Sequence, residues 1–299
     1  MRLLVIYNPK AGAGRGTALL ESISSYLEAK QFKVELQLTE YKGHATELAA
    51  GADLSLYDAV ITCGGDGTQF EVLNGYYQNK STKKPPLGLI PNGTGNAFMK
   101  ELGFEKTDWK QAIDVISLNK PKSIDVGRFM TDNRAYYFLN IVGMGFVSQV
   151  AQAAVPLKWM GNVSYTLATL RSLIGLKSQK ILLELDGRQI ERENVFVEVA
   201  NSVFTGTHFL MAPKAKLDDG LLDVILLNKI SRFKLLRVFT SIYDGSHIHY
   251  PEVEYFQAKK IKIIEHSPTK LAPDGEILGE TPVVFECLHK DLRFLWRAM

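Results

Sequence analysis

The chain lacks the features that would place it outside the cell or inside a membrane. It has only two cysteines, Cys63 and Cys287, which lie far apart and indicate neither a disulfide framework nor a zinc site. No apolar run reaches the length of a membrane-spanning helix, and the N-terminal run Met1–Tyr7 is too short for a signal peptide. We therefore expect a cytoplasmic protein.

Negative charge is missing from one part of the chain. The net charge of +3 is too small to indicate nucleic-acid binding, so we expect none. No aspartate or glutamate occurs between Asp132 and Glu184, a stretch that includes the apolar run Val155–Met160. This suits docking on an anionic bilayer, with Trp159 and Met160 at the interface, but a core helix or a domain interface explains it equally well. The basic residues of this stretch are Arg134, Lys158, Arg171, Lys177 and Lys180.

The composition is that of a globular protein with a proper core. Hydrophobic residues make up 46% of the 299 residues, and the length suits one large domain or two ordinary ones. Three strand–turn–helix units precede residue 120, which predicts a parallel α/β sheet. Alternating runs and the Asp186-Gly187 hairpin signal then predict an antiparallel sandwich, with helices around 146–154, 162–174 and 231–242. We place the domains at 1–121 and 122–299.

A glycine-rich turn follows the predicted strand Ala59–Cys63. In Gly64-Gly65-Asp66-Gly67-Thr68, three glycines let backbone N–H groups approach an anion, and the helix that follows favours phosphate at its start. Asp66 is the one charge of the turn, and Mg²⁺ that accompanies a nucleotide prefers a carboxylate. The alternative is a tight turn in which Asp66 only caps the helix.

Two further strand–turn–helix units have the same design. The loop Asn8–Gly16 carries Lys10 and Arg15 and could hold phosphates, although no Gly-Lys-Ser/Thr sequence ends it as in a Walker motif. The turn Pro91–Phe98 contains Gly93-Thr94-Gly95-Asn96, in which we expect Thr94 to contact phosphate and Asn96 to brace the turn.

Two turns of the second half carry acidic residues. Lys216–Leu221 contains Asp218-Asp219-Gly220, and Ala272–Glu276 contains Asp274-Gly275 before the glutamate. A hydroxyl is a poor nucleophile until a base accepts its proton, and a carboxylate such as that of Glu276 can serve as one. Asp-Gly is also an ordinary sequence for a turn between two strands, so both segments could be plain turns.

In order along the chain, these motifs resemble those of the diacylglycerol kinase catalytic family, which includes bacterial soluble lipid kinases and the sphingosine and ceramide kinases. The shared motifs are Asn-Pro-x-x-Gly from residue 8, Gly-Gly-Asp-Gly-Thr from 64, Pro-x-Gly-Thr-x-Asn from 91, Asp-Asp-Gly from 218 and Asp-Gly-Glu from 274. NAD kinases and phosphofructokinases carry a turn similar to the second motif but do not share the third.

The resemblance implies a Rossmann-like (NAD kinase-like) α/β domain followed by an antiparallel β-sandwich domain, whose last residues return to the first domain in family members. It also implies an ATP-dependent lipid kinase that transfers the γ-phosphoryl group of MgATP to a lipid hydroxyl, and diacylglycerol, converted to phosphatidic acid, is the expected acceptor. By position, the nucleotide would contact Asn8, Pro9, Lys10, Ala11, Gly12, Thr39, Gly64, Gly65, Asp66, Gly67, Thr68, Thr94 and Asn96.

The resemblance also suggests a structural metal and two candidates for the base. In the bacterial branch the Asp-Asp-Gly motif holds Mg²⁺, so Asp219 would supply a side-chain oxygen and Lys216 and Leu221 backbone carbonyls. The late Asp-Gly-Glu motif points to Glu276 as the base. The sphingosine kinase branch assigns that role to the aspartate of the Gly-Gly-Asp-Gly-Thr turn, so Asp66 stays the alternative.

The acceptor and the assembly stay open at this point. A sphingoid base, phosphatidylglycerol and an NAD kinase-type reaction are the alternatives to diacylglycerol, and a non-catalytic sensing module is a further one. We expect peripheral contact with an anionic membrane, while a homodimer is neither favoured nor excluded by the residues.

Overall fold

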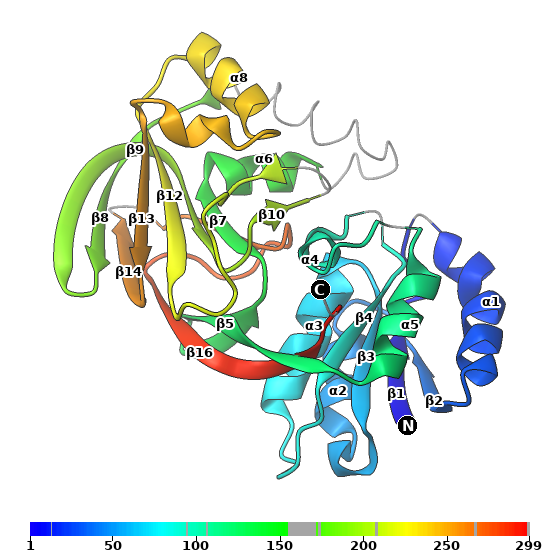
Figure 1. The fold of residues 1–299 in the computed structure, drawn as a ribbon. Helices are drawn as coiled ribbons and strands as arrows, with labels where there is room; N and C mark the ends of the chain where they lie inside the picture. The colour runs from blue at the N-terminus through cyan, green and yellow to red at the C-terminus, as the bar shows by residue number, and fades with distance from the viewer. Residues whose placement is uncertain are drawn as a thin grey trace. The chain divides into compact units, whose positions relative to one another are not determined.

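The chain forms two compact units. A computed structural model describes residues 1–12, 14–93, 95–105, 107–154, 172, 175–206, 209–265 and 268–297. Unit 1 comprises Met1–Ile124 and Lys290–Met299, and unit 2 comprises Asp125–His289 (Figure 1). No helix in these described ranges is long and apolar enough to span a bilayer.

Unit 1 is built on a parallel sheet. Its strands β1 (Arg2–Tyr7), β2 (Lys33–Leu38), β3 (Ala59–Gly64) and β4 (Leu87–Pro91) pair in the order β4–β3–β1–β2. Parallel neighbours need crossover connections, which most of the helices of this unit provide. The helices are α1 (Arg15–Ala29), α2 (His44–Gly51), the 3₁₀ turn η1 (Leu54–Leu56), α3 (Asp66–Gln78), α4 (Ala97–Glu101) and α5 (Trp109–Leu118).

Strands β1, β3 and β4 are buried along almost their whole length, as expected for a parallel sheet that helices cover on both faces. A core cluster joins Leu3 and Ile61 of the sheet to Ile23 of α1 and Ile113 of α5. Helices α2 and α3 pack closely, because a Cβ on Gly75 would lie 2.3 Å from the carbonyl oxygen of Thr46 in α2. Helices therefore pack on both faces of the sheet. The turns at its carboxyl edge begin from strands that this packing holds in place.

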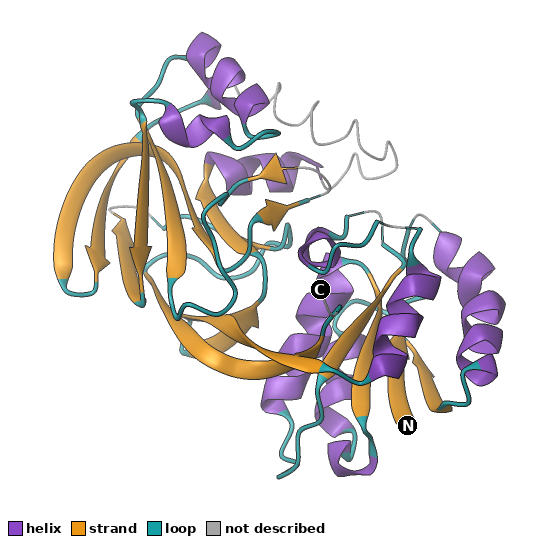
Figure 2. Ribbon diagram, viewed as in Figure 1, coloured by secondary structure: helices purple, strands orange, loops and turns teal. Residues whose placement is uncertain are grey.

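Unit 2 consists mainly of antiparallel strands, which Figure 2 shows as long, curved arrows. The α/β domain and the antiparallel sandwich-like domain that the sequence predicts are thus confirmed. The elements are β5 (Pro121–Thr131), β6 (Arg134–Phe138), β7 (Ile141–Gly145), α6 (Phe146–Ala154), β8 (Gln179–Leu185), β9 (Arg188–Ala200), β10 (Phe204–Thr205), β11 (Phe209–Leu210), β12 (Leu222–Asn228), α8 (Arg232–Ser241), the 3₁₀ turn η4 (Ser246–His249), β13 (Val253–Ala258), β14 (Lys260–Glu265), β15 (Leu271–Pro273) and β16 (Val283–Leu295).

Strand β9 is the central strand of unit 2. Its first half pairs with β8 through the expected Asp186-Gly187 turn, and its second half pairs with β7 on one edge and β12 on the other. Helices α6 and α8 cover this region through a core cluster that includes Phe146, Phe196 and Leu235. The helices predicted at 146–154 and 231–242 are present as α6 and α8, whereas the one predicted at 162–174 lies almost wholly outside the described residues.

Strand β16 belongs to both units. Near its start it pairs antiparallel with β14, where Glu286 lies opposite Lys260. Near its end Phe294 pairs in parallel with Leu87 of β4, and its ring packs edge-on against Phe98 with 5.0 Å between ring centroids. Strand β5 also crosses the division between the units, so two separate strands connect them.

Candidate functional site

The turns that follow β3 and β4 touch through two glycines. A Cβ on Gly93 would lie 2.3 Å from the Cα atom of Gly65, and a Cβ on Gly65 would lie 3.0 Å from the carbonyl oxygen of Gly95. Real Cβ atoms do not approach other atoms as closely as the first of these distances. The glycines at these positions are therefore required by backbone packing, which brings the Gly64–Thr68 and Pro91–Phe98 motifs together.

Two polar side chains hold these turns in place. Asp66 Oδ1 accepts a hydrogen bond from the Ala97 N–H at 2.8 Å, and thus joins the first turn to the second. Within the second turn, Asn96 Oδ1 accepts from the Gly93 N–H at 3.2 Å, and Asn96 Nδ2 donates to the Gly93 carbonyl at 2.9 Å. Through these two bonds the Asn96 side chain ties the two ends of the turn together.

The loop after β1 completes the group. Asn8 Nδ2 donates to Thr68 Oγ1 at 2.9 Å, and the Asn8 N–H donates to the Cys63 carbonyl at 2.9 Å. A Cβ on Gly12, whose φ is +64°, would lie 2.6 Å from the Asn92 carbonyl oxygen. The loops of three neighbouring parallel strands thus form one continuous surface at the carboxyl edge of the sheet, the usual place for ligands in such sheets.

The remaining predicted nucleotide residues of unit 1 lie in or beside these loops. Lys10 donates from Nζ to the Glu40 carbonyl at 2.7 Å, so its ammonium group bridges to the segment after β2. Thr39 is buried at the end of β2, where its N–H donates to the Tyr7 carbonyl at 2.8 Å. Pro9 and Ala11 belong to the loop after β1, Gly64 ends β3, and Gly67 lies in the first turn of α3, whereas Thr94 lies outside the described residues.

The loop surface suits a phosphate-bearing ligand. The first turns of α1 and α3 present N–H groups without partners in their own helix, together with a partial positive charge. Arg15 Nη2 donates to the Gly93 carbonyl at 3.3 Å, while its Nε is buried without a hydrogen-bond partner among the described residues. The same holds for Asn92 Oδ1. These buried polar atoms would gain a partner if a polar ligand or water bound here.

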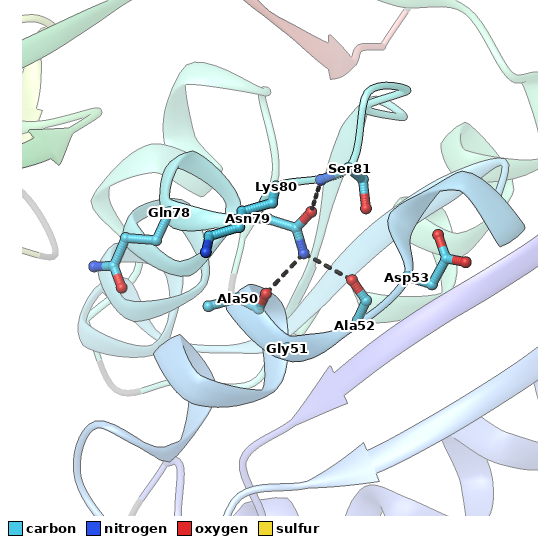
Figure 3. Close-up of a pocket in the computed structure, with 8 residues that line it drawn as sticks. All are labelled: Ala50, Gly51, Ala52, Asp53, Gln78, Asn79, Lys80 and Ser81. Atoms are coloured by element: carbon cyan, nitrogen blue, oxygen red, sulfur yellow. Dashed lines mark hydrogen bonds between the residues drawn. The ribbon is translucent and has the colours of Figure 1, made fainter.

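A pocket of about 600 Å³ opens elsewhere in unit 1, at the C-terminal ends of α2 and α3 (Figure 3). None of the predicted site residues lines it. Asn79 dominates its wall, because its Nδ2 donates to the carbonyls of Ala50 at 3.0 Å and Ala52 at 2.7 Å. This side chain therefore caps the end of α2. Its hydrogen bonds have a structural role, and we assign no ligand to this pocket.

In unit 2, the predicted metal loop is anchored by a buried acid. Asp125 of β5 is fully buried; its Oδ2 accepts from the Gly220 N–H at 2.6 Å, and its Oδ1 lies 2.9 Å from His289 Nδ1. Asp219 is exposed, and its Oδ1 accepts from the Leu221 N–H at 3.0 Å. The loop that carries Lys216, Asp219 and Leu221 is thus anchored to β5 through Gly220 and closed by a bond within the loop.

Asp223 adds a second acid beside this loop. Burial, helped by the charge of Asp219, raises the pKa of its carboxyl to about 6, although hydrogen bonds from Tyr255 and Gln257 oppose the rise. Its Oδ2 is buried without a partner among the described residues. Among the described residues there is no cluster of three or more His, Cys, Asp or Glu side chains. The predicted metal loop would not form such a cluster, because its ligands are one carboxylate and two backbone carbonyls.

Glu276 ends a tight turn next to β7. Asp274 and Gly275 both have positive φ, at +46° and +79°, and the Glu276 N–H donates to the Pro273 carbonyl at 2.8 Å, as in a hairpin turn of the primed kind. Asp274 Oδ1 accepts from the Ile141 N–H at 3.2 Å, which fixes the turn on β7. The half-buried Glu276 therefore follows a turn that hydrogen bonds fix to β7.

One acidic residue was missed by the sequence analysis. Glu198 of β9 is only 2% exposed, and burial raises its pKa to about 8. It lies opposite Gly143 of β7, a pairing that leaves room for its side chain, and its Oε2 has no partner among the described residues. The only sequence signal is a charge inside the apolar run Val195–Ala200.

Comparisons with known proteins agree with this arrangement. Residues 2–129 match the family described as "Diacylglycerol kinase catalytic domain", and residues 140–296 match "YegS C-terminal NAD kinase beta sandwich-like domain". A diacylglycerol kinase from Bacillus subtilis (strain 168) is 30% identical over 294 residues, covering 97% of this chain and 95% of its own. The corresponding protein of Staphylococcus aureus (strain MRSA252) is 32% identical over 295 residues, covering 97% and 91%. A crystal structure of a related Bacillus anthracis protein has a TM-score of 0.82 and 28% identity, covering 99% and 95%.

The contact between the two glycine turns predicts the effect of adding one methyl group. Gly93→Ala forces the turns apart, so the free energy of unfolding should fall by about 1–3 kcal/mol, the typical cost of overpacking. Urea unfolding measures this. Gly51→Ala is the control, because nothing lies within 4 Å of its Cβ position. Equal free energies of unfolding in the two variants would contradict the prediction.

The buried Glu198 predicts an unusual pH dependence of stability. Folding raises its pKa from 4.5 to about 8, so between these pH values the folded state holds a proton that the unfolded state has lost. The free energy of unfolding therefore falls as the pH rises from about 4.5 to about 8. The slope approaches about 1.4 kcal/mol per pH unit. Glu198→Gln should remove this slope, and Glu191→Gln, on the exposed part of the same strand, should keep it. Urea unfolding midpoints at a series of pH values decide between these outcomes.

Proposed function

Because the chain belongs to the diacylglycerol kinase catalytic-domain family, we propose that it transfers the γ-phosphoryl group of MgATP to the hydroxyl group of a membrane lipid, with diacylglycerol as acceptor and phosphatidic acid as product. Membership makes the protein a kinase of that family and implies the use of ATP and a lipid substrate. The relatives from Bacillus subtilis and Staphylococcus aureus are named for diacylglycerol, which supports this acceptor over the alternatives.

The observation that carries the proposal is the junction of three phosphate-type loops in unit 1. The contacts Asn8–Thr68 and Asp66–Ala97, with the close approach of Gly65 and Gly93, unite the motifs of the family match over residues 2–129. We assign the nucleotide to this surface. Phosphoryl transfer requires little covalent help from a protein, so a rigid loop set that positions the phosphates is the expected design.

Glu276 is our proposed general base. The lipid hydroxyl gives its proton to the carboxylate while its oxygen bonds to the γ-phosphorus, and the bond from that phosphorus to the β–γ bridging oxygen breaks to release ADP. The fixed turn at Asp274-Gly275 supports this role. The bond from Ala97 to Asp66 supports a bracing role for Asp66, whose carboxylate also has the chemistry to meet the Mg²⁺ of the nucleotide.

The loop Lys216–Leu221 fits a structural Mg²⁺. Hard cations take oxygen ligands, and the loop offers the exposed carboxylate of Asp219 with the carbonyls of Lys216 and Leu221. Asp223, two residues beyond Leu221, adds a further buried carboxylate next to this loop, and its Oδ2 has no partner among the described residues. When bound, the ion would stabilise this loop electrostatically. We assign it no part in the transfer itself.

The location of the enzyme follows from its substrate. We propose a cytoplasmic enzyme in peripheral contact with an anionic membrane, because the acceptor lies in a bilayer. The part of the acid-free stretch that contains Lys158, Trp159 and Met160 lies outside the described residues, while Lys177 and Lys180 are exposed. A homodimer remains an assembly to be tested by sedimentation.

The test of the function is a kinase assay across a lipid panel. Purified protein is incubated with MgATP and mixed micelles that contain diacylglycerol, a sphingoid base or phosphatidylglycerol, and with soluble NAD, and the products are read by mass spectrometry. We expect phosphatidic acid from diacylglycerol. Turnover of NAD without any lipid product would overturn the proposal, and a preference for another lipid would correct the acceptor.

The choice of base predicts a specific kinetic change. Glu276→Gln keeps the shape of the side chain and removes its basic oxygen, so kcat should fall about 10²–10⁴-fold while nucleotide affinity stays nearly unchanged. Asp66→Asn should instead weaken nucleotide binding. Glu280→Gln is the control, since this residue lies nearby in a partly exposed ion pair with Lys270. A Glu276→Gln enzyme with parental kcat would transfer the role to Asp66.

The metal assignment predicts a change in thermal response. Mg²⁺ should raise the melting temperature of the parent, because an ion that binds only the folded state stabilises it. Asp219→Ala should abolish that rise and lower activity as well. Asp218→Ala, the same charge change one residue away, should retain the rise. Equal responses of the parent and Asp219→Ala to Mg²⁺, measured by differential scanning fluorimetry with Ca²⁺ as a comparison, would rule out the site.

A further inference from the structure

Helix α8 of unit 2 has one face firmly buried. Leu235, Val238 and the following Ile242 pack into the core cluster that also contains Ile225 and Leu227 of β12. Ser231 caps its start, since its hydroxyl accepts from the Lys234 N–H at 3.4 Å. The helix, labelled in Figure 1, is therefore fixed to the unit through this face.

The opposite face of α8 is apolar where a surface helix is usually polar. Phe233 is 89% exposed, and Leu236 is 36% exposed. Tyr243, just beyond the end of the helix, is 48% exposed. Arg232 and Arg237 are exposed on the same face, because residues 232, 233, 236 and 237 project within one side of a helix of 3.6 residues per turn. We call these five residues the α8 face.

The charges around the α8 face leave it positive. The segment 224–243 contains no aspartate or glutamate, so the helix has no acid of its own. Asp244 follows it, and its carboxylate accepts hydrogen bonds from the Ser246 N–H and hydroxyl at 2.9 and 2.6 Å. The two lysines of this segment pair with acids of other elements, as Lys229–Glu193 and Lys234–Glu252. Arg232 and Arg237 are both exposed and add two positive charges to the face.

We propose that the α8 face docks unit 2 on the surface of a bilayer that contains anionic phospholipid. An exposed phenylalanine and leucine bury apolar area among the acyl chains, while arginines beside them interact with phosphate groups at the headgroup level. A tyrosine suits the interface, because it has an apolar ring and a polar tip. The combination of an apolar centre with two arginines, and no acid within the helix itself, matches an anionic membrane better than a mixed-charge protein surface.

The inference rests on the proposed function, since a lipid kinase must reach an acceptor in a bilayer. It adds a surface that lies outside the acid-free stretch 133–183 and consists entirely of described residues. Binding to vesicles is measured without nucleotide, so it is tested whether or not the protein phosphorylates diacylglycerol. Loss of lipid turnover with vesicle binding intact would refute the function and leave the docking standing.

The experiment measures cosedimentation of the full chain with phosphatidylcholine vesicles that contain or lack phosphatidylglycerol. We expect the parent to bind the anionic vesicles, more strongly at low salt than at high salt. Phe233→Ser should lower the partition coefficient about tenfold, and the double change Arg232→Glu with Arg237→Glu should lower it at least tenfold. Turnover of short-chain diacylglycerol in detergent should survive in both variants.

The matched control is Arg188→Glu with Lys262→Glu. These residues are exposed in the same unit, on the β8–β9 hairpin and β14, and their reversal changes the net charge by the same amount. If this control loses as much binding as the α8 variants, or if the parent does not sediment with anionic vesicles, the proposal is wrong. A parent dimer that becomes monomeric in Phe233→Ser, without vesicle binding by either, would show that the face contacts a second copy instead.

A direct readout guards against a variant that folds poorly. Phe233→Trp places a fluorescent ring at the centre of the face and keeps its apolar character. Its emission, taken as the difference from the parent, should shift to shorter wavelength on addition of anionic vesicles and be quenched by brominated lipid. An unchanged difference spectrum would overturn the docking.

Discussion

The close approach of two backbones, at Gly65 and Gly93, is the contact on which the candidate site of unit 1 depends. Parallel strands about 4.8 Å apart bring their carboxyl ends to one edge, but only residues without a Cβ let the turns there lie directly against each other. Once they do, Asp66 reaches the Ala97 N–H across the junction. Removing the backbone contact would separate this pair, whereas the bond from Asn8 to Thr68 joins the loop after β1 to the same assembly from the other side.

Unit 2 positions its loops by a different device. Where unit 1 relies on the absence of side chains, unit 2 uses carboxylates that accept from backbone N–H groups of another segment. Asp125 holds Gly220, and Asp274 holds Ile141. Charge-assisted bonds of this kind are stronger than neutral ones, so single residues can fix whole turns. Asp125 and Asp274 therefore have a structural role, which the residue type alone does not reveal.

Sequence periodicity and turn chemistry predicted most of the elements, because their causes are local. The run Leu3–Tyr7 had to be a buried strand, and Asp186-Gly187 had to be a turn, since its two residues adopt positive φ at +47° and +87°. Facts that depend on distant neighbours could not be predicted. Glu198 lies in the part of β9 that is buried on both faces. Lys10 donates to a carbonyl 30 residues away along the chain. The sequence located the candidate site, whereas the partner of each side chain needed the fold.

The shared strand β16 has a consequence for the order in which the protein is made. During synthesis, the first 124 residues leave the ribosome with β4 as an open sheet edge, because its outer neighbour, around Phe294, comes only after the whole of Asp125–His289. An unpaired edge is a template for pairing with other chains. The α/β unit therefore starts first and finishes last, and a nascent chain needs either rapid completion or a chaperone to protect that edge in the meantime.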